Sequence, residues 1–165
     1  MTAAPVLLFS CEVEHPQAAA ASRTLRAAAR KYLAALGLGG RELSLLLVSD
    51  AAIKKLNRVH RGKAKATDVL SFPQEEPAQA ARARGPIGDV VISLHTAQRQ
   101  AAEGGWSLAA ELRRLLAHGL LHCLGHDHER PADAKKMAAA ELALLGRAGM
   151  VGESLAAQRS QRSHA

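Results

Sequence analysis

Three histidines in the second half of the chain constrain the local fold more than any other feature. His118, His122 and His128 follow one another at spacings of four and then six residues. Because four residues make about one turn of an α-helix, His118 and His122 should project from one helix face, with Cβ atoms roughly 5–6 Å apart. Gly125 stands where such a helix should end, since glycine readily adopts the left-handed conformation common there. The chain can then turn back and offer His128 as a third imidazole.

This spacing predicts a metal site. Three protein ligands on a tetrahedral ion leave one position for water, which is the arrangement of catalytic zinc sites. Zn2+ suits an all-imidazole site, although iron, nickel, copper or cobalt can bind the same nitrogens. Surface histidines that interact favourably with a helix dipole are the alternative. His126 and Asp127 are candidates for orienting a ligating ring or for handling protons, and a carboxylate commonly takes the first role.

The glutamate of zinc peptidases is missing from this motif. In the peptidase helix His-Glu-x-x-His, the glutamate after the first histidine is the general base, and here that position is Gly119. A zinc-bound water has a pKa of about 7 in favourable sites, so hydroxide can form without that glutamate. Peptide hydrolysis also needs a proton for the amine leaving group, and nothing beside the predicted helix supplies one. An ordinary zinc peptidase is therefore disfavoured.

A basic segment lies upstream. Four cations fall within eight residues around Gly62, namely Arg58, Arg61, Lys63 and Lys65. Arginine can form paired hydrogen bonds to phosphate oxygens and lysine adds a point charge, so such a turn suits a phosphate-rich ligand. Taken alone, the segment is more typical of a solvated basic loop.

Together with the histidines, this segment resembles the YbeY endoribonuclease family, bacterial factors for ribosomal RNA maturation. The matching motifs are Arg61-Gly62-Lys63, Thr67-Asp68-Val69-Leu70-Ser71-Phe72-Pro73, Gly88-Asp89-Val90-Val91-Ile92-Ser93 and the segment from His118 to His128. Their order and separations also fit the family, and the similarity covers roughly residues 6 to 146. The combination of the histidine motif with Arg61-Gly62-Lys63 and with the segment from Asp68 to Pro73 is specific.

The resemblance implies the roles of individual residues. His118, His122 and His128 fall on the family's zinc ligands, with one ion per chain, and Arg61 falls on an arginine regarded as important for ribonuclease activity. Asp68 is a weaker candidate for positioning or proton handling. Arg58, Lys63 and Lys65 are candidates for binding RNA phosphates. The chain departs from the common pattern at His60 and His126, where tyrosine is usual, at Cys123, where leucine is usual, and at Ala64 and Ala66 in the basic loop.

The formal net charge of +7, with a pI near 10.0, fits a polyanionic partner such as RNA. Aromatic residues make up only 2% of the chain, so stacking platforms for bases are almost absent, and recognition should rest on phosphates and shape.

Length predicts one domain over residues 1–152 and a polar, disordered tail over 153–165. Cys11 and Cys123 do not make a disulfide framework, and Cys123 is expected to be a small buried residue. There is no apolar run of about 18 residues and no charged region before the first apolar stretch. We therefore expect a cytoplasmic protein without a membrane span, and no nucleotide cofactor.

The predicted fold is α+β, a small mixed sheet of about four strands packed with about five helices around a zincin-like metal site. Strands are expected at 5–13, 42–49, 67–72 and 87–93, and helices at 17–36, from Asp50, from Ser93 or Thr96 to Glu103, from Ser107 through the histidines, and from Pro131 to Leu145. Asp50 and Ser107 are the predicted caps, and Glu111 is expected to complement its helix dipole. Residues 73–86 are expected to form an exposed loop.

The resemblance implies a single-strand-specific, zinc-dependent endoribonuclease that matures the 3′ end of small-subunit ribosomal RNA and serves ribosome quality control, with the small ribosomal subunit as partner. Two alternatives stay open. One is a zinc-dependent peptidase or other metallohydrolase. The other is a non-catalytic ribosome assembly factor with structural zinc, which a fourth protein ligand such as His126 would favour.

Overall fold

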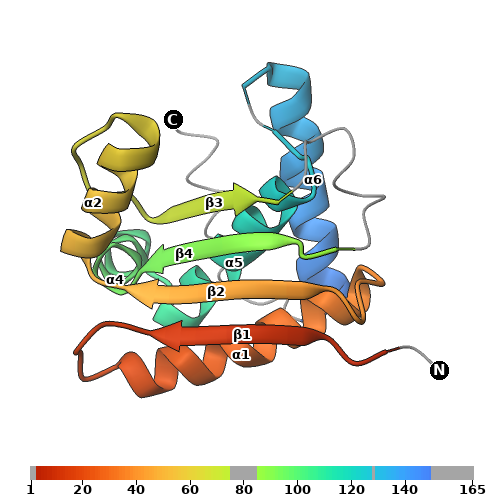
Figure 1. Ribbon diagram of the computed structural model, residues 1–165, viewed down its shortest axis with the longest axis horizontal. Helices are drawn as coiled ribbons and strands as arrows, with labels where there is room; N and C mark the ends of the chain where they lie inside the picture. The colour runs from red at the N-terminus through yellow and green to blue at the C-terminus, as the bar shows by residue number, and fades with distance from the viewer. Residues whose placement is uncertain (1–2, 75–84, 128, 150–165) are drawn as a thin grey trace.

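The computed structural model describes residues 3–74, 85–127 and 129–149 (Figure 1). In this part of the chain there are four strands and five helices: β1 Val6–Cys11, α1 Ala18–Ala35, β2 Glu42–Val48, α2 Asp50–Arg61, β3 Val69–Pro73, β4 Gly88–Ser93, α4 Leu94–Gly104, α5 Leu108–Cys123 and α6 Pro131–Arg147. The α+β fold is confirmed, and the expected element ends differ from these by at most two residues. The expected loop at 73–86 falls largely, and the expected tail at 153–165 wholly, outside the described residues.

The sheet is mixed, with strand order β1-β2-β4-β3. β1, β2 and β4 are parallel, whereas β3 pairs with β4 in the antiparallel sense. β2 is central, and its residues Leu43, Leu45 and Leu47 are fully buried on one face. Since side chains alternate along a strand, Ser44 and Leu46 lie on the opposite face. The apolar run expected to form a buried strand therefore does so.

Helices cover the two faces of the sheet unequally (Figure 1). α5 contacts β3, β4 and the neighbouring helices α1, α4 and α6, and its residues Leu112, Leu115 and Leu116 belong to the main core. α2 packs on the other face through Ile53, in a smaller cluster with Val91 and others. No helix in the described ranges is both long and apolar enough to cross a bilayer. α5 is thus the buried centre of the domain, and it carries two of the three histidines.

Of the two predicted helix caps, one is confirmed and one is wrong. Ser107 caps α5 as predicted, because its side chain accepts a hydrogen bond from the backbone N–H of Ala110 at 3.1 Å. The cap of α2 is Ser49, which accepts from the backbone N–H of Ala52 at 3.2 Å, rather than Asp50. Both residue types suit this position, so local sequence does not separate them.

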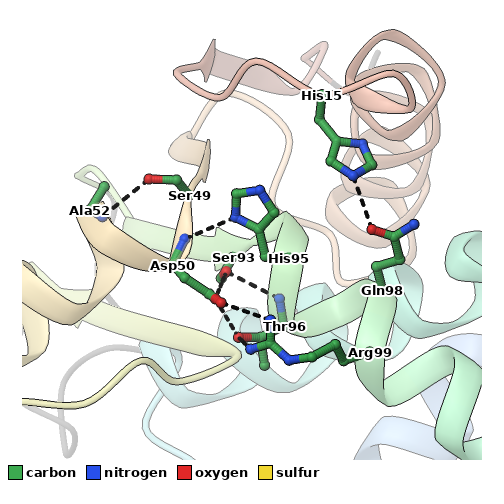
Figure 2. A network of polar contacts seen from close by, with 9 residues as sticks. All are labelled: His15, Ser49, Asp50, Ala52, Ser93, His95, Thr96, Gln98 and Arg99. Carbon is green, nitrogen blue, oxygen red and sulfur yellow. Dashed lines mark hydrogen bonds and ion pairs between the residues drawn. The ribbon is translucent and has the colours of Figure 1, made fainter.

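Asp50 instead joins the starts of two helices at the carboxyl ends of β2 and β4 (Figure 2). Its carboxylate accepts from the Ser93 and Thr96 hydroxyls at 2.7 and 2.6 Å and pairs with Arg99 at 2.8 Å. Its backbone N–H donates to Nδ1 of His95 at 3.2 Å. Partial burial opposes ionisation, but hydrogen bonds from Ser93, Thr96 and Arg99, with the Arg99 charge, lower the pKa of Asp50 to about 2. The cluster locks the start of α2 to the start of α4.

Candidate metal centre

The last two turns of α5 bring two of the predicted ligands together. The rings of His118 and His122 lie with their centroids 4.7 Å apart and their planes at 77°, and both residues are partly buried. This is the side-by-side arrangement that the spacing of four residues predicts. Two imidazoles so placed can bind a single ion.

The end of α5 turns the chain sharply. Gly125 has a φ of +98°, in the left-handed region where glycine is favoured. The backbone N–H of Gly125 donates to the His122 carbonyl at 3.0 Å, and that of His126 donates to the Leu121 carbonyl at 3.0 Å. This pair of bonds is a Schellman motif, and it reverses the chain immediately after the histidine pair. The predicted role of Gly125 as a helix stop is confirmed.

The remaining residues of the motif differ in exposure. His126 is partly buried and Asp127 is exposed. The third predicted ligand, His128, lies outside the described residues. Among the residues with a described placement, no group of three His, Cys, Asp or Glu side chains is arranged to hold a metal ion. The geometry therefore supplies two members of the predicted ligand set, and the third stays a prediction.

A carboxylate from another helix contacts the first histidine. Nδ1 of His118 pairs with Oε1 of Glu141, which lies in the middle of α6. Metal-ligating histidines commonly bond their second ring nitrogen to a carboxylate, which fixes the ring orientation. The histidine pair and its carboxylate thus fit a metal centre by their chemistry. Glu141 was not among the residues predicted for the site, although an acidic residue on the helix face shared with Met137, Leu144 and Leu145 was a usable signal.

Glu111 stands in the first turn of α5, the position from which it was predicted to complement the helix dipole. Its side chain is completely buried, accepting from the indole N–H of Trp106 at 2.6 Å and pairing with Arg114 at 2.5 Å. Burial opposes the charge of Arg114, but the hydrogen bond and charge of Glu111 hold its pKa above the usual value. A buried charge needs such a partner. Glu111 therefore belongs to an internal polar network.

Asp68 joins the same network. With its amide nitrogen facing both carboxylates, Gln100 donates to Glu111 at 2.8 Å and to Asp68 at 3.3 Å. The other Asp68 oxygen accepts from the backbone N–H of Val69 at 2.7 Å. These contacts tie the start of β3 to α4 and α5. They favour a positioning role for Asp68 over a direct part in proton transfer.

The predicted basic cluster lies at the carboxyl end of α2 and in the following loop. Arg58, Arg61, Lys63 and Lys65 are all exposed. The helix ends at Gly62, whose φ is +68°. Asn57 is buried and donates its amide to the Lys65 carbonyl at 3.0 Å, so the loop is fastened to α2 despite Ala64 and Ala66. The cations therefore form one solvent-facing group.

β3 follows the basic loop in the chain and packs against α5, the helix that carries His118 and His122. The Ser71 hydroxyl donates to the Gly119 carbonyl at 3.0 Å. A Cβ added at Gly119 would lie 2.8 Å from Val90 Cγ1, 3.1 Å from Ser71 Oγ and 3.1 Å from Val69 Cγ2. Position 119 therefore faces the sheet at close range and points into the packed interior.

Comparison with known proteins places the chain in a family. The model of the family described as endoribonuclease YbeY matches residues 10–149. The chain belongs to the endoribonuclease YbeY family. This confirms the resemblance seen in the sequence motifs.

Sequence identity to individual YbeY proteins supports the same family. The chain is 58% identical over 144 residues to the endoribonuclease YbeY of Myxococcus xanthus, covering 87% of this chain and 49% of that protein. It is 55% identical over 143 residues to that of an Anaeromyxobacter species, covering 86% of this chain and 72% of the relative. The chain thus spans about half the length of the first relative.

A solved structure supports the fold. The solution structure of TM1509 from Thermotoga maritima resembles this chain with a TM-score of 0.61 at 23% identity, over 97% of this chain and 96% of that one. At this identity the likeness concerns the fold alone, and it agrees with the four-stranded sheet and its helices.

Proposed function

We propose that the chain is a zinc-dependent endoribonuclease that cuts single-stranded RNA, with ribosomal RNA precursors as its substrates. Membership of the endoribonuclease YbeY family carries this proposal. The paired His118 and His122 rings, with the exposed cations of the α2 end, supply the chemistry that such an activity needs. Maturation of the small-subunit RNA 3′ end, ribosome quality control and association with the small subunit are the finer parts of the proposal.

His118, His122 and His128 would hold the ion. When bound, zinc supplies Lewis-acid chemistry toward a phosphoryl oxygen or an attacking water. Arg61 would bind the scissile phosphate through paired hydrogen bonds and stabilise its growing negative charge. Arg58, Lys63 and Lys65 would hold neighbouring phosphates, while His126 and Asp127 are candidates for moving a proton at the metal site.

The packing of Gly119 argues against the peptidase alternative. A peptidase of the zincin type needs a glutamate at this position to activate water. Here the position faces Val90, Ser71 and Val69 at distances that leave no room even for a Cβ. Since neither the side chain nor space for one is present, the ribonuclease is the better-supported hydrolase.

Replacing a predicted ligand tests the metal part of the proposal. We expect His122→Ala to lose zinc and RNA cleavage together, measured as metal per chain and as cleavage of a single-stranded ribosomal RNA fragment. His15→Ala, which changes an imidazole on the β1–α1 connection, is the control and should retain zinc. Full cleavage by metal-free His122→Ala would overturn the mechanism.

Replacing the arginine tests the phosphate part. We expect Arg61→Ala to slow cleavage by about 10²-fold, the effect typical of losing one group that stabilises a transition-state charge, with zinc content near that of the wild type. Arg30→Ala on the exposed side of α1 removes one positive charge elsewhere and should cleave normally. An unchanged rate in Arg61→Ala would remove Arg61 from the site. Incubation with an unfolded protein in place of RNA should give no cleavage.

A further inference from the structure

The side chain of Glu141 occupies a position where a carboxylate is costly. It projects from α6 beside Met137, Leu144 and Leu145, and only 5% of the residue is exposed. An ionised carboxylate in such surroundings destabilises a protein unless it is paired. The Glu141 carboxylate pairs with the His118 ring on α5. A buried acid that contacts a predicted metal ligand requires an explanation beyond packing.

We propose that Glu141 is a positioning residue of the metal centre, which accepts the Nδ1–H of His118 and so presents Nε2 of that ring to the ion. This inference rests on the zinc-binding part of the proposed function. A neutral imidazole carries one proton, and the group bonded to one ring nitrogen decides which nitrogen is left to bind a metal. An ionised carboxylate only accepts hydrogen bonds, so its contact with Nδ1 places the proton there.

Arg114 helps α5 to accommodate the carboxylate. It lies four residues before His118, hence on the same side of the helix, and Glu111 holds its guanidinium in place. Glu141 is among the nearby charges that favour the charged state of Arg114. The Arg114 charge therefore interacts with Glu141 through space, while the imidazole contacts it directly.

The assignment makes α6 part of the metal centre although α6 carries none of the three predicted ligands. α5 and α6 pack against each other, and the pair His118–Glu141 spans their interface. Groups that orient metal ligands typically change metal affinity by about 10–100-fold when removed. Zinc affinity should therefore depend on a residue 23 positions along the chain from the histidine it contacts.

Zinc affinity and the ring tautomer test the proposal without using catalysis. We would measure zinc dissociation constants by competition with a chromophoric chelator for the wild type, Glu141→Ala, Glu141→Gln and the control Glu103→Gln, an exposed acid on α4. Nitrogen-15 spectra of the histidine rings in the metal-free proteins would report the tautomer of His118, with the signal assigned by its loss in His118→Ala. Circular dichroism would verify that each variant is folded.

We expect Glu141→Ala to weaken zinc binding by about 10–100-fold and to lose the Nδ1–H tautomer of His118. Glu141→Gln keeps an acceptor oxygen and should fall between the wild type and Glu141→Ala, which keeps the test decisive should the alanine variant not fold. Glu103→Gln should match the wild type. Zinc affinity in both Glu141 variants within twofold of the wild type, or an Nε2–H tautomer in the wild type, would overturn the proposal.

The same measurements separate this inference from the proposed function. Unchanged zinc binding in His118→Ala would overturn both the metal site and the role of Glu141. Loss of zinc in His118→Ala with unchanged zinc binding in Glu141→Ala would overturn only the role of Glu141. Weaker binding in Glu141→Ala would support that role even if the wild type did not cleave RNA.

Discussion

At Gly119 the backbone of α5 comes closer to the sheet than any side chain would allow. The nearest atoms belong to Val90, Ser71 and Val69, all in the strands that α5 covers. This close approach brings the histidine turn against β3, the strand that follows the basic loop. A single hydrogen atom in place of a side chain thus sets the distance between helix and sheet.

We expect Gly119→Ala to destabilise the domain. Forcing a methyl group into a packed interior costs about 1–3 kcal/mol, which equals or exceeds the gain of about 1 kcal/mol from replacing glycine by alanine in a helix. Urea unfolding of the metal-free protein measures the difference. Gly146→Ala, at an exposed position of α6, should be neutral or slightly stabilising. A Gly119→Ala protein more stable than the wild type would contradict this account of the packing.

Between elements, Asp50 connects α2 to the start of α4 through Ser93, Thr96 and Arg99. Its position matters for the proposed site, because α2 carries the basic cluster at its other end. A shift of α2 against α4 would move the exposed cations relative to the sheet. The contacts of Asp50 therefore help to hold the basic loop in place, although the two lie at opposite ends of α2.

The stability that the Asp50 charge provides should depend on pH. Its pKa is about 2 in the folded protein, below the ordinary value of 3.8, so the stabilisation is complete above the ordinary value and disappears as pH falls through about 2. We expect Asp50→Asn to be less stable than the wild type at pH 7, with the difference shrinking between pH 4 and 2. Thermal unfolding across this range measures it, with Glu103→Gln as the control for lost charge. A constant difference would argue against the role of the carboxylate charge.

The bounds of the helices and strands could be predicted from the sequence, whereas the contacts between helices at the metal site could not. Apolar periodicity, Ser107 and Gly125 gave the bounds and the stop of α5, because these signals act within a few residues. The contacts of Glu141 with His118, and of Glu111 with Trp106 and Arg114, depend on which helices pack together. Local sequence does not determine that pairing. The preference for Ser49 over Asp50 as a cap likewise depends on Ser93 and Thr96, far along the chain.

For the whole molecule, the net charge of +7 should make RNA binding strongly dependent on salt. Binding to single strands releases counterions, and the logarithm of the affinity falls with the logarithm of salt concentration by about 0.7 per neutralised phosphate. The slope therefore counts phosphate contacts. The salt slope can show whether the exposed cations at the end of α2 make the phosphate contacts. The alternative is that the net charge of the protein attracts RNA without specific contacts.

We expect replacement of Arg58, Lys63 and Lys65 by glutamine to reduce the salt slope by about 2, which is three contacts at about 0.7 each. Fluorescence anisotropy of a labelled single-stranded RNA, titrated at several salt concentrations, measures the slope. Glutamine at Arg23, Arg30 and Lys31, exposed residues of α1, removes the same number of charges and is the control. Equal slopes in the two triple variants would show that the basic loop makes no specific phosphate contacts.

Cys123 directly follows a predicted ligand and is buried, as expected from the sequence. Burial and then the Asp89 carboxylate raise the pKa of its thiol to about 12, so little thiolate is present at neutral pH. Cys11, at the end of β1, is exposed. Oxidants and alkylating reagents should therefore meet Cys11 first and leave the neighbour of His122 intact. The chain has a natural attachment point for a fluorescent label, away from the residues proposed to bind zinc.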